Sequence, residues 1–172
     1  MTENNTENLL TIELKDGTVE IELFPEDAPK HVERIKELAQ EGLYDGVTFH
    51  RVMEGFMAQT GDVKYGNYND YDEDRVGTGG SDKPDLAAEF NERKHVRGTC
   101  SMARSSLPDS ANSQFFICFD TADFLDGDYT VWGQVISGME HVDKIKRGAS
   151  GSGSVTDPDF MSKVFPGKRE ED

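Results

Sequence analysis

The side chains of this chain that are best suited to chemistry lie in one stretch, residues 47–62, which is VTFHRVMEGFMAQTGD. Arg51 and Gln59 stand there among apolar and aromatic neighbours. Arginine and glutamine rarely enter an apolar surface unless their hydrogen-bonding groups find partners. The pattern therefore predicts a groove with an apolar floor and a planar, permanently charged guanidinium on one wall.

Acid–base and nucleophilic chemistry are less well supported by the sequence. Ser105, Ser106 and Ser110 have no evident base partner, which disfavours a hydrolase. His50 is interpreted as a structural histidine with satisfied hydrogen bonds rather than as an acid or base. The remaining histidines are expected at the surface: His31, His95 and His141.

Metal binding is also disfavoured. Cys100 and Cys118 lie in apolar segments without acidic or histidine neighbours at ligand spacing, so both are expected to be buried thiols. Residues 64–85 are rich in Asp, Asn and Gly, and their composition suggests calcium. The bidentate glutamate of an EF-hand is missing at the required offset, so a solvated loop is preferred over a calcium-dependent interaction protein.

Composition narrows the class of protein. The chain has 172 residues, enough for one domain with a substantial core. Its 34 acidic and 18 basic residues give a formal net charge of −16, spread along the whole chain. This charge excludes non-specific binding to nucleic acid and to anionic membranes. It favours adaptation to high salt, with an ordinary acidic cytosolic protein as the alternative.

The N-terminal sequence MTENNTENLL has neither a basic region nor an apolar core, so no signal peptide is expected. No apolar run is long enough to span a bilayer. These features predict a cytoplasmic protein, and nothing in the sequence demands more than a monomer.

The first elements are well marked. Residues 9–15 and 18–24 alternate around Asp16-Gly17, which predicts a β-hairpin with Val19, Ile21 and Leu23 on its buried face. Pro29 and the acids before it are typical of a helix start. Apolar residues then recur at helical spacing until Gly42, which predicts a helix over 31–41.

Later segments are shorter. Strands are predicted over 95–103, 114–119, 129–135 and 160–165, a second helix over 138–147 and a flexible turn over 148–153. Many short strands with two helices favour a mainly β fold, an antiparallel barrel capped by helices. We expect a single domain over 9–167, with flexible polar tails at 1–8 and 168–172.

Five short motifs in order resemble the cyclophilin-type peptidyl-prolyl isomerases. The motifs are FHR, FMAQ-x-GD, SMAR, SQFFI and FLDGDYTVWG, and the resemblance covers roughly residues 9–165. It implies a closed eight-stranded antiparallel barrel with an α-helix over each open end. The implied activity is interconversion of cis and trans X-Pro peptide bonds in proline-containing polypeptides, without a cofactor, metal or covalent intermediate.

The resemblance also implies roles for single residues. Arg51 matches the catalytic guanidinium, with Gln59 either orienting it or binding the substrate backbone. The implied proline pocket consists of Phe56, Met57, Phe116 and Leu125. Residues before proline would be bound by Ala103, Arg104 and Gln114, with Phe124 and Tyr129 at the far rim.

Four positions depart from the commoner family pattern. Phe124 replaces a tryptophan and loses an indole N–H donor, which predicts only weak binding of a cyclosporin-like ligand. Tyr129 stands in place of a histidine, Arg104 in place of an asparagine and Thr60 in place of a glycine. The leading hypothesis is an isomerase that assists protein folding. The alternative is a non-catalytic module that binds proline motifs and would not need Arg51.

Overall fold

The computed structural model describes residues 8–167 and contains one antiparallel sheet of eight strands. Apart from Asn8, the predicted tails at 1–8 and 168–172 lie outside the described residues. The strand order is β3-β4-β6-β5-β7-β2-β1-β8. The strands are β1 (Leu9–Leu14), β2 (Gly17–Leu23), β3 (Arg51–Met53), β4 (Met57–Thr60), β5 (Thr99–Met102), β6 (Phe115–Cys118), β7 (Val131–Ser137) and β8 (Lys163–Pro166).

The predicted N-terminal hairpin is confirmed. Strands β1 and β2 pair antiparallel, and their register closes at Leu14 and Gly17 around the Asp16-Gly17 turn. Val19, Ile21 and Leu23 are buried, while the alternate residues of β2 are more exposed. The period of two in the sequence therefore sets which face of β2 joins the core.

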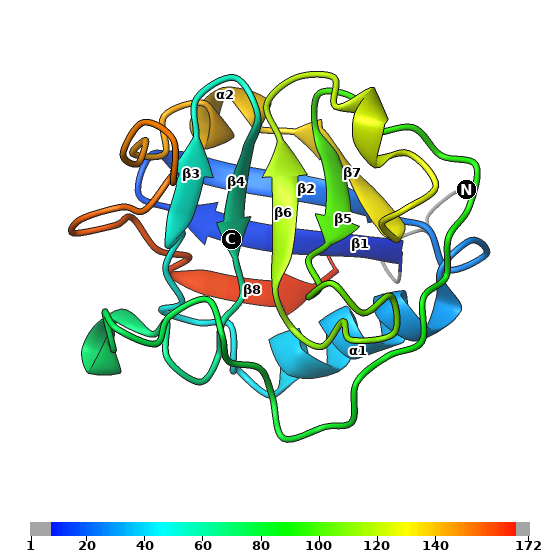
Figure 1. Cartoon of the computed structure of the whole chain (residues 1–172), viewed down its shortest axis with the longest axis horizontal. Coiled ribbons are helices and arrows are strands. Elements are labelled where there is room, and N and C mark those ends of the chain that lie inside the picture. Colours follow the sequence, from blue (N-terminus) through cyan, green and yellow to red (C-terminus); the bar gives the residue numbers. More distant parts are fainter. Residues whose placement is uncertain (1–7, 168–172) are drawn as a thin grey trace.

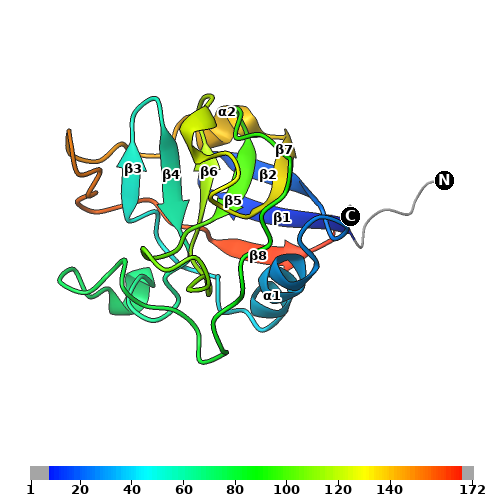
Figure 2. The same ribbon diagram turned by 45° about the vertical axis from the view of Figure 1, so that its right-hand side comes forward.

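The sheet is strongly curled but open, so the prediction of a closed barrel is wrong. In Figure 1 and Figure 2 the strands β3, β4, β6 and β5 cross over β2, β1 and β8. The end strands β3 and β8 do not pair with each other. Within residues 8–167 the chain around β3 is joined to the segment before β8 by isolated bridges, such as Thr48–Phe160 and Arg51–Ser154, and by scattered backbone hydrogen bonds, such as that from the Val52 amide to the Gly153 carbonyl. Strand β3 has three residues, and the chain opposite it turns through Gly151, Gly153 and Asp157 at positive φ, so no continuous ladder forms.

Two helices lie at opposite ends of the curled sheet (Figure 1). Helix α1 (Pro29–Gln40) begins at Pro29, as predicted, and buries Val32, Ile35 and Leu38. Helix α2 (Met139–Val142) is much shorter than the predicted 138–147. The amides of Lys144 and Ile145 donate to carbonyls three residues back, so the chain tightens into turns after one helical turn.

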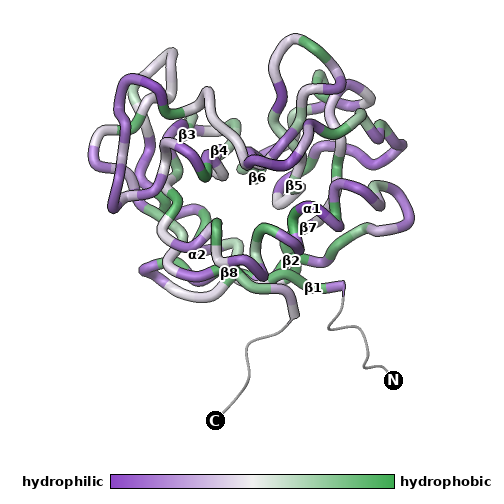
Figure 3. Tube along the Cα trace, turned by 90° about the horizontal axis from the view of Figure 1, so that it is seen from below, coloured by the Kyte–Doolittle hydropathy of each residue, from purple (hydrophilic) through white to green (hydrophobic). Residues whose placement is uncertain are grey.

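The other predicted strands all form, within shorter or shifted bounds. The predicted loop over 64–85 contains a single short 3-10 helix, η2 (Tyr68–Asp70), and no strand. In Figure 3 the hydrophobic stretches of the trace gather on strands such as β1 and β2, while many peripheral loops are hydrophilic. Within residues 8–167 neither helix combines the length and apolarity that a membrane span requires.

The buried apolar side chains of residues 8–167 form two clusters. The larger one fills the inside of the curled sheet and contains Trp132, Phe115 and Cys100. The smaller one consists of Met57, Phe116, Cys118, Ala122 and Leu125. Both cysteines are free and buried, as predicted, and burial raises the pKa of each thiol. The smaller cluster supports the outer surface of the sheet where the predicted groove lies.

Candidate active site

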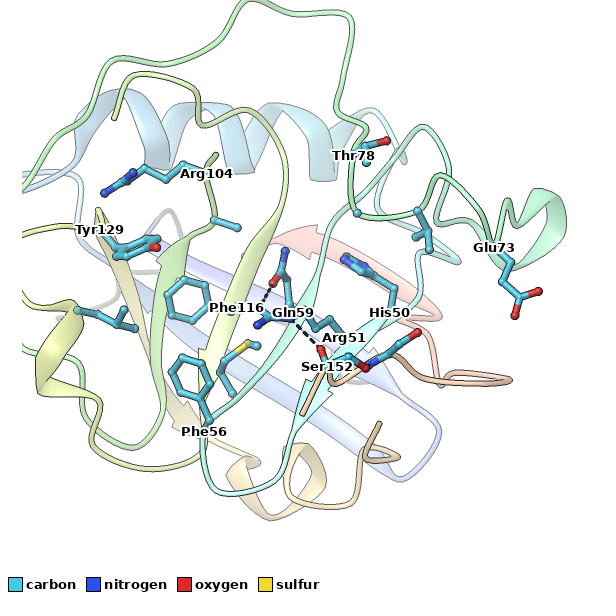
Figure 4. Close-up of a pocket in the computed structure, with 16 residues that line it drawn as sticks. His50, Arg51, Phe56, Gln59, Glu73, Thr78, Arg104, Phe116, Tyr129 and Ser152 are labelled. Atoms are coloured by element: carbon cyan, nitrogen blue, oxygen red, sulfur yellow. Dashed lines mark hydrogen bonds between the residues drawn. The ribbon is translucent and has the colours of Figure 1, made fainter. Parts of the chain in front are cut away.

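The predicted groove exists as an open cavity of about 420 Å³ over β3, β4 and β6 (Figure 4). Arg51 on β3 and Gln59 on β4 both line it. They are direct partners in the antiparallel register of these two strands. Cross-strand partners on one face lie close enough for their side chains to interact. The short β3–β4 hairpin is thus what brings the two polar residues together.

Arg51 is held by three hydrogen bonds. Its Nη1 donates to Oε1 of Gln59 at 3.2 Å, and its Nε donates to the carbonyl oxygen of Ser152 at 3.2 Å. Its Nη2 donates to Sδ of Met53 at 3.4 Å. A guanidinium carries five N–H donors, so two remain for a ligand. Within residues 8–167 no carboxylate lies within 4.0 Å of Arg51, and its charge is not neutralised by an ion pair.

Gln59 belongs to a relay of side-chain amides. Its Nε2 donates to Oε1 of Gln114 at 2.9 Å, and Nε2 of Gln114 donates to the carbonyl of Gly79 at 2.9 Å. Because the Gly79 carbonyl only accepts, it fixes the orientation of both amides in turn. Each end of the Gln59 amide makes a hydrogen bond within the protein, so its orientation relative to Arg51 is fixed. Gln114 itself lines an adjoining cavity of about 760 Å³.

The residues predicted to form a proline pocket lie together on the apolar side of the cavity. Phe56, Met57, Phe116 and Leu125 all line it. Met57 comes from β4, where it pairs with Cys118 of β6. Leu125 comes from the 3-10 helix η3 (Asp123–Leu125). Met57 and Phe116 are almost fully buried, because the smaller apolar cluster packs behind them. This wall is apolar and packed against a buried cluster, which suits an aliphatic ring.

The far side of the cavity contains Ala103, Arg104 and Tyr129. The Tyr129 ring meets the edge of Phe116 at 5.9 Å between ring centroids. Phe124 does not line the cavity. It is 68% exposed and packs on Phe56 at 5.5 Å, so it extends the apolar surface at the rim. All the predicted site residues except Gln114 and Phe124 therefore meet around one cavity.

Residues outside the predicted set complete the cavity. Ser152 anchors Arg51 from the segment 148–153, which was expected only to be a flexible turn. Val76, Gly77 and Thr78 form another part of the wall. No spacing rule connects these loops with Arg51, because they reach it only through the tertiary fold.

Buried Asp62 organises the loop that carries Val76–Thr78. Its Oδ1 accepts from the amides of Lys64 and Tyr65, and its Oδ2 accepts from those of Gly77 and Gly79. Four amide donors compensate for the burial of the carboxylate. An aspartate directly after a strand and before a turn-rich loop was the available signal, since such side chains bond to amides two or three residues on.

His50 lies beside this loop and also lines the cavity. It is buried, but neither ring nitrogen has a hydrogen-bond partner among residues 8–167, so the prediction of satisfied hydrogen bonds is wrong. Burial lowers the pKa of His50 to about 4, with a smaller lowering from Arg51 and an opposing effect of Asp62. His50 is therefore neutral at pH 7 and adds no charge to the site.

Two further histidines correct the expectation of surface positions. His31 and His95 are both fully buried. Nδ1 of His31 lies 2.7 Å from Oε1 of Glu89, and Nδ1 of His95 lies 2.9 Å from Oδ1 of Asp126. Each histidine is paired with an acid far away in the sequence, which a scan for local patterns does not detect.

Comparisons with known proteins agree with this geometry. Residues 9–164 match the model of the family described as cyclophilin type peptidyl-prolyl cis-trans isomerase/CLD. A probable peptidyl-prolyl cis-trans isomerase of Brucella suis is 59% identical over 160 residues, which is 92% of this chain and 82% of the relative. A peptidyl-prolyl cis-trans isomerase of Helicobacter pylori is 42% identical over 141 residues, 80% of each chain.

Solved structures show the same fold. A cyclophilin from Hirschia baltica superimposes with a TM-score of 0.77 at 28% identity, over 92% of this chain and 73% of that one. A cyclophilin-type isomerase of Cryptosporidium parvum was solved in the presence of the dipeptide Ala-Pro. It superimposes with a TM-score of 0.80 at 26% identity, over 94% of this chain and 99% of that one. By sequence, fold and the grouping of its cavity residues, this chain belongs to the cyclophilin-type peptidyl-prolyl cis-trans isomerases.

Proposed function

We propose that Arg51 is the residue that accelerates rotation about X-Pro bonds in this enzyme. One observation carries the proposal. The guanidinium is fixed by Gln59 and by the Ser152 carbonyl at the wall of an apolar cavity, and two of its N–H donors remain free. It is thus a donor of fixed direction beside a pocket that suits the pyrrolidine ring.

The chemistry requires such a donor. Resonance gives the amide C–N bond partial double-bond character, with a rotation barrier of about 18–20 kcal/mol. In the twisted state the resonance is lost, and the prolyl nitrogen carries a localised lone pair. A rate increase of about five decades needs roughly 7 kcal/mol of selective stabilisation of that state. An N–H donor aimed at the nitrogen binds the twisted amide better than either planar isomer.

The apolar wall has a separate task in this mechanism. Phe56, Met57, Phe116 and Leu125 hold the proline ring still while the carbonyl on its N-terminal side rotates. No bond between heavy atoms forms or breaks and no proton is transferred. The neutral state of His50 at pH 7 is compatible with this scheme, because the reaction needs neither an acid nor a base.

The substrate backbone would lie along the end of β5. The carbonyl of Ala103 and the amide of Arg104 have no hydrogen-bond partner among residues 8–167. An extended peptide can bond to such exposed main-chain groups as an added strand. The Ala-Pro dipeptide present with the Cryptosporidium parvum relative supports proline-containing polypeptides as substrates. We infer that these substrates are cytoplasmic chains and that the enzyme acts on them as a monomer.

Exchange spectroscopy by NMR on a short Ala-Pro peptide tests the proposal. We expect Arg51→Ala to lower the catalysed exchange rate by about 100-fold or more, as removal of one preorganised donor does elsewhere. Arg97→Ala is the matched control, because Arg97 is paired with Asp143 and lies outside the cavity. An Arg51→Ala variant that exchanges the peptide as fast as the parent would refute the assignment.

A further inference from the structure

Among the arginines that the structure describes, two stand apart because they lack acidic partners. Seven arginines lie within residues 8–167, and five of them have a carboxylate within 4.0 Å. The paired ones are Arg34, Arg75, Arg93, Arg97 and Arg147. The two without such a partner are Arg51 and Arg104, and both line the cavity. In a chain with a net charge of −16, two unpaired arginines in one groove leave positive charge for a ligand.

The mechanism uses Arg51 but gives no task to the guanidinium of Arg104. That group is nevertheless held firmly. Its Nε and Nη2 donate to the Asp128 carbonyl at 3.0 and 2.7 Å, and its Nη1 donates to the Ser105 carbonyl at 3.0 Å. Its Cζ lies 4.5 Å from the centre of the Tyr129 ring. These contacts fix the fork without neutralising its charge, and two N–H donors remain.

Arg104 also stands at the right place to meet a substrate side chain. It lines both the cavity that contains Arg51 and the adjoining one that contains Gln114. Figure 4 shows its side chain beside Tyr129, on the opposite side of the cavity from Arg51 and Ser152. Tyr129 in turn touches Phe116, on which the proline ring would rest. A peptide extended along Ala103 and Arg104 would carry its residues before proline past this guanidinium.

We infer that Arg104 is a specificity residue that favours substrates with a carboxylate side chain one or two residues before the proline. The inference rests on the proposed function, because it takes the proline ring to lie on Phe116. The pairing would be charge-assisted, with the free N–H donors of a preorganised fork meeting a carboxylate. Preorganisation matters here because little side-chain entropy remains to be lost when the ligand binds.

Other charges near the groove set the size of the effect. Lys64 adds a positive charge to the adjoining cavity, while Asp82 and Asp85 add negative ones, and Glu73 lines the cavity with Arg51. The net charge of −16 disfavours the approach of acidic peptides. A preference for acidic peptides would therefore be a local property of Arg104 that opposes the overall field, and this contrast makes it testable.

The experiment compares exchange rates of short peptides by NMR at about 20 mM salt. The peptides carry Glu, Gln or Lys either directly before proline or one residue further away, and a neutral Ala-Ala-Pro peptide serves as reference. The variants are Arg104→Gln and the charge reversal Arg104→Glu. Arg97→Gln is the matched control, since it removes the same charge at the other end of β5. Thermal unfolding of each variant confirms that it is folded.

For the parent we expect kcat/KM for Glu to exceed that for Lys by about fivefold at one of the two positions. Arg104→Gln should remove that preference, Arg104→Glu should reverse it, and Arg97→Gln should leave it unchanged. Salt at 0.5 M should weaken it, because the Debye length falls to a few ångström. A Glu-to-Lys ratio that is the same in the parent and in Arg104→Gln at both positions would overturn the inference. Failure to exchange even the neutral peptide would instead refute the proposed function.

Discussion

At the scale of single residues, the groove is built from side chains whose direction is set before any substrate arrives. Arg51 is bonded to Gln59 and Ser152, and Gln59 is bonded to Gln114. Fixed donors lose little to reorganisation during the reaction, which is why they stabilise a transition state better than mobile ones. We therefore propose that Gln59 contributes through Arg51, as a positioning residue.

A double-mutant cycle tests this dependence. Gln59→Leu removes the acceptor for Nη1 of Arg51 while keeping a similar volume, so we expect kcat/KM to fall about tenfold. In an Arg51→Ala background the same change should have less than about a twofold effect, because there is no guanidinium left to orient. The exchange rate of one Ala-Pro peptide is measured with the parent, the two single variants and the double variant. Additive losses would indicate that Gln59 contacts the substrate independently.

His50 leads to a prediction about pH and stability. Its pKa is lowered to about 4 in the folded protein, from a value near 6.5 in the unfolded chain. Between these values the unfolded chain binds a proton that the folded protein does not, so stability falls as the pH falls. Because His50 is buried in its neutral form, it should lower the free energy of unfolding by up to about 3 kcal/mol as the pH falls from 7 to 4.

Urea unfolding between pH 7 and pH 4.5 measures this effect. In His50→Gln the free energy of unfolding should fall less steeply as the pH is lowered, since glutamine does not titrate. The lowered pKa of buried His31 acts in the same direction and remains as background. His141→Gln is the control, because its ring is partly exposed. Identical slopes for the parent and His50→Gln would contradict the burial argument.

At the scale of elements, helix α1 is capped from a distant part of the chain. Ala28 at its N-cap makes no side-chain hydrogen bond. Glu89 takes over this task, as its carboxylate accepts from the amides of Lys30 and His31 and from Nδ1 of His31. Negative charge at a helix N-terminus is favourable, and the contact ties the long segment before β5 to the helix.

Removing this cap should destabilise the protein. We expect Glu89→Ala to lower the free energy of unfolding by about 2 kcal/mol, because two helix amides and the buried ring of His31 lose their acceptor. Glu33→Ala is the matched control on the exposed face of α1 and should change stability by less than about 0.5 kcal/mol. Urea unfolding at pH 7 measures both variants. Equal losses would mean that Glu89 acts only through its charge.

The elements also show what sequence can and cannot predict. Local patterns predicted the hairpin at Asp16-Gly17 and the start of α1 at Pro29, because turn chemistry and proline geometry act within a few residues. The barrel was predicted from the pattern of short strands and from the resemblance, and its closure is wrong, because closure depends on whether β3 and β8 meet across the fold. The length of α2 was also overestimated, since its apolar spacing continues beyond the helical hydrogen bonds.

The same distinction holds for the site. The motifs identified the residues around the cavity, including Arg51 and the apolar wall. They did not identify Ser152, whose contribution is a main-chain carbonyl that any residue type could supply. Nor did they identify His95, which pairs with Asp126 across 31 positions. Local sequence patterns do not predict contacts that are made through the backbone or between residues far apart in the chain.

At the scale of the whole molecule, the excess of acids is the dominant feature. A net charge of −16 on 172 residues produces self-repulsion that opposes the folded state. Most ion pairs are exposed and contribute little, so they do not offset it. Salt screens this repulsion, and a protein adapted to high salt would depend on that screening.

We therefore predict that the free energy of unfolding rises as KCl increases from about 0.02 M to 2 M, by on the order of 1–2 kcal/mol. Urea is the suitable denaturant, because guanidinium chloride is itself a salt. Simple screening is nearly complete by about 0.5 M, where the Debye length is a few ångström. A further rise towards 2 M, together with loss of structure in dilute buffer, would indicate adaptation to high salt. A protein that stays fully folded in dilute buffer, with stability independent of KCl, would be an ordinary acidic isomerase.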